Sequence, residues 1–266
     1  TIMCCAKGIC YVELVARGTA YDLHSANATM APNAAWRLTW ALATLKDQHE
    51  HILIPGFYDK LRPLTPAELQ ALDGIPNDDA ILLDDWQISE FLGGKRGKER
   101  IADNLFAPTC TICGMLSGYT GIGSKTVLPS EARAKIDFRL VPDQDPAEIV
   151  RLLRAHLDTN GFNDLEILEF GHEHPARFSP DSLVTAAMAR AIRSTYGKEP
   201  IVYPSMAGTG PVYPVCALPG TPMTSGCGAG YKGTLVHSPN ENIRLADYWN
   251  AMRCMGAFIE EFAQAE

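Results

Sequence analysis

Residues 131–162, EARAKIDFRLVPDQDPAEIVRLLRAHLDTNGF, decide the fold of this chain. The first part, EARAKIDFRLV, alternates apolar and polar side chains, which predicts a β-strand with one buried face. The rest is typical of a helix. Asp145 is placed to cap it and Glu148 to complete a capping box. Pro146 suits its first position, and Gly161 lies just past its end.

Three further strands and one helix surround this unit. The helix is APNAAWRLTWALATLKD (31–47), and the strands are GICYVELVARGTAYDL (8–23), PTCTICGMLSG (108–118) and DLEILEFG (164–171). The order along the chain is strand, helix, strand, strand, helix, strand. That order is the split β-α-β, or ferredoxin-like, arrangement. We therefore expect an α+β domain over residues 8–174.

An insertion of about residues 48–105 interrupts this domain after its first helix. TPAELQAL (65–72) carries a capping box, which predicts a short helix. NDDAILLDDW (77–86) indicates a loop and another short helix, and GGKRGKER (93–100) indicates a polar, flexible loop.

A second unit follows over residues 175–266. It has capped helical patterns at 179–197 and 245–264, with short strands expected between glycines and prolines. About 90 residues with few strands are typical of part of a domain. The fold class is therefore α/β, with an α+β unit followed by a piece of a second α/β domain.

Composition excludes several classes of function. The formal charge is −8 over 266 residues, so nucleic-acid binding has no electrostatic support. No apolar run is long enough to span a membrane. Eight cysteines in a chain of this length do not indicate a disulfide scaffold. We expect most of them to be reduced and buried, which favours a cytoplasmic protein. Cys110 and Cys113 lie on a predicted strand, where residues three apart point to opposite faces and cannot chelate a metal together.

Several short motifs are near misses. GYTGIGSKT (118–126) nearly matches a phosphate-binding P-loop, and GAGYKG (228–233) matches G-x-G-x-x-G, but neither is followed directly by a helix. The triplets 49–51 and 172–174 both read His-Glu-His; solvated or structural histidines are the more economical interpretation, because no third ligand is in sight.

Three single residues remain as candidates. His24 follows the first strand, and a lone histidine there is more often structural. Arg139 interrupts an alternating strand; it suits a surface ion pair or a bidentate clamp for a carboxylate. His237, in LVHSPNEN, follows a glycine-rich run and is a plausible metal ligand.

Together the motifs form a series that resembles the di-zinc amidohydrolases, the family of aminoacylase, carnosine dipeptidase, carboxypeptidase G, acetylornithine deacetylase and succinyl-diaminopimelate desuccinylase. The series is DLHS (22–25), HILIPGFYD (51–59), GSKTVLP (123–129), DFRLVPDQ (137–144), GTGP (208–211) and HSPNEN (237–242). The segments IPGFYD and KTVLP look most like the carnosine dipeptidase branch. In that family a ferredoxin-like lid, which also dimerises, interrupts a zinc-binding catalytic domain.

The resemblance implies a role for each matching residue. His24 would reach across the dimer and stabilise the oxyanion of the tetrahedral intermediate. Thr126 and Arg139 would help to hold the carboxylate of a small peptide or N-acyl amino acid. Gly208, Thr209 and Gly210 would offer backbone or hydroxyl contacts to the substrate. His237 would be a ligand of one of the two zinc ions that activate the attacking water.

The family's other metal ligands and its general base precede the lid, and this chain starts close to its first lid strand. We therefore expect the chain to be part of a zinc-dependent dipeptidase-like enzyme and to be inactive alone. A non-enzymatic dimerisation module, or a remnant of such an enzyme, is the alternative; a nucleotide-binding protein is a remote third. A homodimer is expected through the lid, because Trp36 and Trp40 form a second apolar stripe on the first helix.

Overall fold

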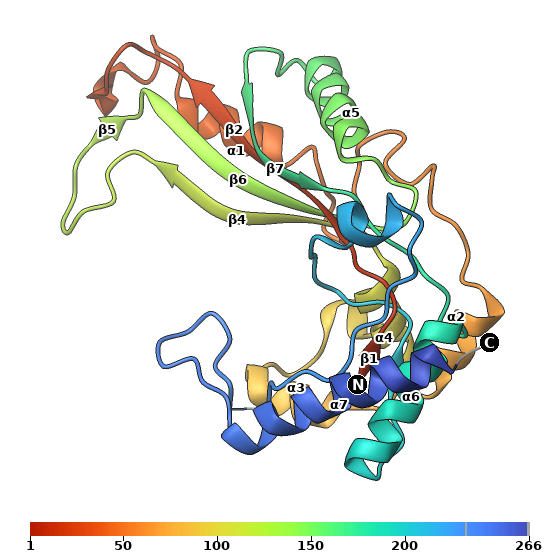
Figure 1. Cartoon of the computed structure of the whole chain (residues 1–266). Helices are drawn as coiled ribbons and strands as arrows, with labels where there is room; N and C mark the ends of the chain where they lie inside the picture. The colour runs from red at the N-terminus through yellow and green to blue at the C-terminus, as the bar shows by residue number, and fades with distance from the viewer. Residues whose placement is uncertain (232, 265–266) are drawn as a thin grey trace.

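A four-stranded antiparallel sheet dominates the computed structural model, which describes residues 1–231 and 233–264 (Figure 1). Its strands are β2 (Gly8–Arg17), β4 (Thr109–Ser117), β6 (Glu131–Leu140) and β7 (Glu166–Glu173). They lie in the order β4-β6-β2-β7, with every neighbouring pair antiparallel. The first and third strands of this sheet in chain order, β2 and β6, thus occupy its centre, which is the ferredoxin-like order that the sequence predicts.

Two helices, α1 (Ala34–Leu42) and α5 (Pro146–Thr159), cover one face of this sheet. Apolar side chains alternate toward them, and Leu14, Phe138 and Leu153 are fully buried between the layers. Asp145 caps α5, as predicted, by accepting hydrogen bonds from the Ala147 and Glu148 amides. The predicted capping box is wrong, however. The Glu148 carboxylate pairs with Lys60 on the inserted segment instead.

The inserted segment forms three helices, α2 (Pro66–Asp73), α3 (Asp79–Trp86) and α4 (Gly97–Phe106), and a single turn, η2 (Leu92–Gly94). The capping box of α2 is present as predicted. The loop predicted over residues 93–100 is wrong from Gly97 onward. Tertiary contacts select the helix there: the Gly97 amide donates to Asp79, and Arg100 pairs with the same carboxylate.

These helices lie away from α1 and α5, next to the C-terminal part of the chain (Figure 1). Leu72 and Ile101 form a small apolar cluster that also contacts Tyr203. Arg177 donates to the buried carboxylate of Glu68 at the start of α2. The proposed division at residues 174 and 175 remains a prediction, since the insertion contacts the far side of that boundary.

The C-terminal part contains two packed helices, α6 (Leu183–Tyr196) and α7 (Leu245–Ala263). Ser182 caps α6, and Gly197 ends it with a left-handed φ of 63°. Strand β1 (Ile2–Met3) pairs in parallel with β8 (Val202–Tyr203). The several short strands predicted after α6 are mostly wrong. Among the described residues only β8 and an isolated bridge at Ser225 pair there, and 213–217 form a π-helical turn, because glycine and proline interrupt any longer ladder.

All the connections between the sheet and the lower part of the molecule leave from one end of the sheet. Ile9 pairs with Arg139 and Glu173, and Arg139 pairs with Thr109, so the four strands are aligned in one row at this end of the sheet. We refer to this row of residues as the hinge. Gly8 lies at the crossing point. A Cβ there would lie 2.5 Å from the Glu173 carbonyl oxygen, so a close backbone approach requires glycine.

The other end of the sheet carries a small pair of strands, β3 (Leu23–His24) and β5 (Val127–Leu128). The turn η1 (Ser25–Asn27) directly follows β3. Figure 1 shows this tip far from α6 and α7. In the part of the chain that the structure describes, no helix is long and apolar enough to cross a membrane.

Candidate active site

His24 and Thr126 lie together at the tip of the sheet. His24 pairs with Val127 across β3 and β5, and the Ser25 amide donates to the Thr126 carbonyl oxygen over 3.0 Å. The Thr126 hydroxyl is 3.4 Å from His24 Nε2. His24 Nδ1 accepts from the Ala26 amide, which fixes the ring and leaves Nε2 on the exposed side. An exposed, oriented imidazole of this kind can donate a proton or a hydrogen bond.

Arg139 and Thr209 lie together at the hinge, although they are 70 residues apart. Arg139 Nη1 donates to the Thr209 hydroxyl over 2.8 Å, and that hydroxyl donates to the Gly8 carbonyl oxygen over 3.1 Å. The Lys7 amide donates to the Gly208 carbonyl oxygen. The Gly210 carbonyl accepts from Val212 in the following turn. Three of the predicted substrate-binding residues therefore share one location.

A carboxylate already accompanies Arg139. Asp137 lies two residues away on β6, on the same face of the strand, and its Oδ2 accepts from Arg139 Nε over 3.0 Å. Its second oxygen, Oδ1, is buried without a hydrogen-bond partner among the described residues. Asp137 therefore fixes the guanidinium and carries an acceptor that an incoming donor could use.

Lys7 completes the hinge cluster. Its side chain is only 3% exposed, and Nζ donates to the carbonyl oxygens of Asn104 and Ala107 at the end of α4. Burial, reinforced by the charge of nearby Arg139, lowers the pKa of Lys7 to about 8. Lys7 and Arg139 thus lie near each other, with Lys7 Nζ directed to the end of α4 and Asp137 paired with the guanidinium. Sequence reasoning missed Lys7 and Asp137 as site residues; the Asp-x-Arg spacing on a strand was the one available signal.

The two clusters cannot serve one substrate within a single chain. Gly8 and Arg17 are the two ends of β2, with the hinge cluster at Gly8 and the His24 tip beyond Arg17. Ten residues of strand separate them by about 30 Å. A dipeptide is far shorter than that distance.

His237 lies apart from both clusters, on an exposed loop with a φ of 61°. In the described residues, no three His, Cys, Asp or Glu side chains gather where they could hold a metal ion. One imidazole does not make a zinc site, which takes three or four protein ligands. His237 can therefore supply one ligand at most, and the residues present do not fit a metal centre by themselves.

The two His-Glu-His triplets are structural in this fold. His51 stacks on Tyr58, and His174 stacks on Tyr213. His172 Nε2 lies 2.6 Å from the Glu169 carboxylate on the same strand. His51, His172 and His174 therefore have separate partners, and His49 Nε2 lies 3.4 Å from the side chain of the adjacent Gln48.

The cysteines are mostly free. Six are unpaired, four of them buried, but Cys227 and Cys254 form a disulfide that the sequence did not indicate. Cys110 is buried and Cys113 exposed, on opposite faces of β4 as expected. Burial is the main reason that the pKa of Cys110 is raised to about 12.

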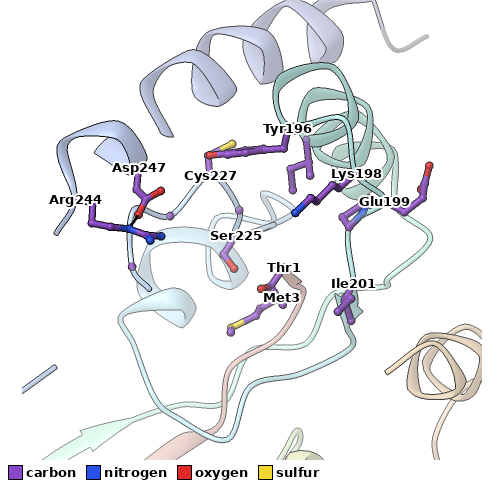
Figure 2. Close-up of a pocket in the computed structure, with 15 residues that line it drawn as sticks. Thr1, Met3, Tyr196, Lys198, Glu199, Ile201, Ser225, Cys227, Arg244 and Asp247 are labelled. Carbon is purple, nitrogen blue, oxygen red and sulfur yellow. Dashed lines mark hydrogen bonds and ion pairs between the residues drawn. The ribbon is translucent and has the colours of Figure 1, made fainter. Parts of the chain in front are cut away.

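A cavity of about 590 Å³ lies between the start of the chain, α6 and the first turn of α7 (Figure 2). Lys198, Glu199, Arg244 and Asp247 give its wall polar groups, and Arg244 pairs with Asp247. None of the seven predicted site residues lines it, within the described part of the chain. It is therefore separate from both clusters.

Residues 6–164 match the family model of the peptidase dimerisation domain, M20_dimer. Among curated proteins, the Beta-Ala-His dipeptidase of Mus musculus is 27% identical over 97% of this chain and 53% of its own length. The Cys-Gly metallodipeptidase dug1 of Schizosaccharomyces pombe is 26% identical over 97% of this chain and 55% of its own length. The chain therefore spans about half the length of these curated relatives.

Two solved peptidase structures also superpose on this chain. An M20 family metallo-carboxypeptidase, Sso-CP2 from Sulfolobus solfataricus, superposes with a TM-score of 0.93 at 39% identity, over 98% of this chain and 60% of that one. Human carnosine dipeptidase 1 superposes with a TM-score of 0.81 at 25% identity, over 99% of this chain and 56% of that one. Both comparisons cover the hinge cluster and the tip alike.

Proposed function

This chain belongs to the M20 peptidase family and is a relative of its metallodipeptidases, and from that premise we propose that it forms the lid and the C-terminal catalytic segment of a dipeptidase. The substrate is a dipeptide or N-acyl amino acid with a free carboxylate. The reaction is hydrolysis of its amide bond. Residues 8–174 form the lid and 175–266 belong to the catalytic unit.

The hinge cluster carries this proposal. Arg139 and Thr209 present a guanidinium and a hydroxyl 2.8 Å apart, and Lys7 adds a second cation nearby. A guanidinium flanked by a hydroxyl suits a carboxylate better than a neutral amide. Asp137 orients Arg139 before the substrate arrives. Gly208 and Gly210 leave the backbone open to an extended substrate.

His24 acts on the partner subunit's substrate. It lies about 30 Å from the hinge cluster of its own chain, as the length of β2 requires. A two-fold dimer through the lid brings the tip of one chain to the hinge of the other. There His24 Nε2 donates to the oxygen that becomes negative as water attacks the amide carbon. Thr126 beside it holds the substrate.

The exposed apolar surface of the lid supports such a dimer. Trp36 and Trp40 stack on the outer side of α1, both more than half exposed. Met115 on the neighbouring edge strand β4 is 57% exposed. An apolar helix face beside an unpaired strand edge is a typical surface for a second copy.

A zinc centre would take His237 as one ligand. Its other ligands would come from residues other than those that the structure describes. When bound, zinc would activate the attacking water. The described residues of the chain do not form that centre, so we propose that the 266-residue chain alone is inactive. The predominance of free cysteines favours a cytoplasmic setting.

Mixed dimers test the role of His24 in trans. We would place this chain in one polypeptide with the catalytic segment of its longer relatives, and mix the His24→Ala and Arg139→Met variants. A mixed dimer then keeps one intact site, so a random mixture recovers about a quarter of the wild-type rate. Recovery no greater than the sum of the two variants alone would show that His24 acts in cis or not at all.

Substrate analogues test the carboxylate clamp separately. Arg139→Lys should raise KM for a dipeptide at least about tenfold, because the bidentate geometry is lost, and leave KM for the dipeptide amide nearly unchanged. An equal effect on both substrates would contradict the clamp.

A non-enzymatic dimerisation module remains the second candidate, because the described residues contain no group of three or more His, Cys, Asp or Glu side chains that could hold a metal ion. Zinc content separates the two. A complete enzyme should bind close to two zinc ions per polypeptide, whereas a module should bind none.

A further inference from the structure

Residues 227–231 and 233–243 lead from the cavity wall to α7 and include His237; we refer to these described residues as the His237 segment. Its first residue, Cys227, is bonded to Cys254 in the middle of α7, 27 residues further on. A covalent bond thus joins the start of this segment to the helix that follows it. Figure 2 shows Cys227 on the loop that passes between α6 and α7.

The non-covalent contacts of this segment run largely within it. Tyr231 donates from its amide to Thr234 and from its hydroxyl to Asn242. Asn242 donates in turn to the carbonyl oxygen of Gly233. Arg244, at the start of α7, lies over the Tyr231 ring. Among the described residues these contacts shape the loop, and its first residue, Cys227, also packs on α6, where its Sγ lies 3.4 Å from Met188 Sδ.

The backbone of the segment is held in costly conformations. Cys227, Leu235, His237 and Asn240 all have positive φ values, between 56° and 65°. A left-handed conformation costs roughly 1 kcal/mol at a non-glycine residue. Such conformations persist where surrounding structure imposes them. The bond to Cys254 is one constraint of that kind.

The two sulfurs differ in access. Cys227 is half-buried and lines the cavity of about 590 Å³, whereas Cys254 is fully buried. The cavity is wide enough for a small thiol, and its wall carries both cations and carboxylates, with Arg244 paired to Asp247. An external thiolate can therefore reach Cys227 but not Cys254.

We propose that Cys227–Cys254 is an exchangeable thiol–disulfide site, which low-molecular-weight thiols open and low-molecular-weight disulfides close, and which fixes the His237 segment on α7. Opening begins when a thiolate attacks Cys227 Sγ. A mixed disulfide forms there, the Cys227–Cys254 bond breaks, and the Cys254 thiolate leaves and takes up a proton. A second thiolate attacks the mixed disulfide and releases the Cys227 thiolate, which is protonated. Two small thiols are oxidised to one disulfide as two electrons reduce the protein.

The surroundings make this pair different from the other cysteines. Burial is the main reason that the pKa values of the Cys5 and Cys10 thiols are raised to about 12, so these thiols resist exchange. Stable disulfides are uncommon in reducing compartments, where the exceptions tend to be regulatory. A half-accessible disulfide in an otherwise reduced protein fits that exception.

Thiol counting under defined redox conditions tests the chemistry. The folded 266-residue chain is equilibrated with oxidised or with reduced glutathione, then acid-quenched, denatured and alkylated. Opening the one disulfide frees two thiols, so alkylation at residues 227 and 254 should be lost in oxidised buffer and recovered in reduced buffer, as peptide mapping reports. The Cys254→Ser variant should hold a glutathione adduct at Cys227. A pair that does not form in oxidised glutathione, or does not open in the folded chain, would overturn the proposal.

Limited proteolysis tests the structural consequence. Chymotrypsin should cut after Tyr231 or Leu235 roughly tenfold faster in reduced buffer, since release of the segment allows its backbone to unfold locally into the protease. Cys227→Ala should be cut at the fast rate in both buffers. Cys110→Ser, which alters a buried free cysteine in the sheet, should keep the wild-type difference. Equal cutting rates of the wild type in both buffers would refute the structural role of the bond.

Discussion

The lid sheet and the α6–α7 pair differ in the number of apolar residues that each one buries. In the lid, α1 and α5 cover one face of the sheet, and twenty-two described residues form one buried cluster. The corresponding cluster around α6 and α7 has eight. The lid therefore contains what it needs to be stable alone, and the α6–α7 pair does not.

The cluster around α6 and α7 is small because the outer face of α7 is not covered by other described residues. It carries large apolar side chains at helical spacing, each at least 44% exposed: Leu245, Tyr248, Trp249, Met252, Met255, Ile259 and Phe262. The inner face, with Cys254 and Phe258, packs on α6. A helix apolar on two sides is stable only when both are covered. The four predictions below probe this contrast.

The largest expected effect is in the lid core. Phe138→Ala removes a fully buried ring between sheet and helices and should lower the free energy of unfolding by about 3–5 kcal/mol. Met188→Ala in the smaller cluster should cost less, about 2–3 kcal/mol, because the thinner core relaxes more easily. Urea unfolding with separate probes for each region measures both. Phe170→Ala, on the open face of the same sheet, is the matched control and should cost less than about 1 kcal/mol. Equal costs for Phe138→Ala and Met188→Ala would remove the contrast.

The next effect is at the contact between the inserted helices and the C-terminal part. The Glu68 side chain is 1% exposed and accepts from Arg177 and from Thr65. Glu68→Gln leaves Arg177 without its charge partner and should cost about 2–3 kcal/mol. Glu148→Gln, which breaks the more exposed pair with Lys60, should cost about 0–1 kcal/mol. If thermal unfolding shows the same loss for both variants, burial does not set the strength of the Glu68 contact.

A smaller effect depends on pH and is confined to the lid. His156 on α5 is buried and lies 3.0 Å from the Thr44 hydroxyl, just after α1. Burial outweighs that hydrogen bond and lowers the pKa of His156. The folded lid therefore binds this proton less readily than the unfolded chain does. Its stability is full above about pH 6.5, the ordinary histidine value, and falls as the pH drops below it.

His156→Gln should flatten this part of the stability curve, as urea midpoints measured from pH 5 to 8 would show. An unchanged slope in His156→Gln would assign the acid sensitivity to other groups.

The smallest effect on stability is expected on the outer face of α7. Trp249→Gln should change the free energy of unfolding by no more than about 0.5 kcal/mol, because the ring is 56% exposed. It should nevertheless reduce concentration-dependent association in light scattering, since it breaks the apolar stripe. Trp86→Gln on α3, with a similarly exposed ring, should leave association unchanged. If Trp86→Gln reduced association more than Trp249→Gln did, the outer face of α7 would not be the surface through which the chains associate.

The lid was the part of the fold that local sequence signals could predict. The period-two alternation of the strands agrees with the observed sheet, and Asp145 caps its helix as predicted. The start of helix α4 escaped prediction because the glycines in GGKRGKER (93–100) indicate a loop, whereas the Gly97 amide is held by the carboxylate of Asp79, eighteen residues earlier. The region between α6 and α7 has no periodicity, so only tertiary contacts define it.

The candidate site divides in the same way. The resemblance supplied Arg139 and Thr209, and the fold brings them to 2.8 Å, a contact that no spacing along the sequence predicts. Lys7 went unnoticed because its burial depends on the end of α4, about 100 residues later. The Cys227–Cys254 bond likewise joins a loop to a helix that share no sequence pattern.

A rotation of the lid about the row of residues next to Gly8 would displace the far end of the lid the most. The strands enter and leave through one row at the hinge, while the His24 tip stands about 30 Å away along β2. A turn of about ten degrees at that row would carry the tip through about 5 Å, more than the length of a hydrogen bond. In the proposed dimer, a small rotation at this row would therefore engage the His24 imidazole at the partner subunit's site or withdraw it from there.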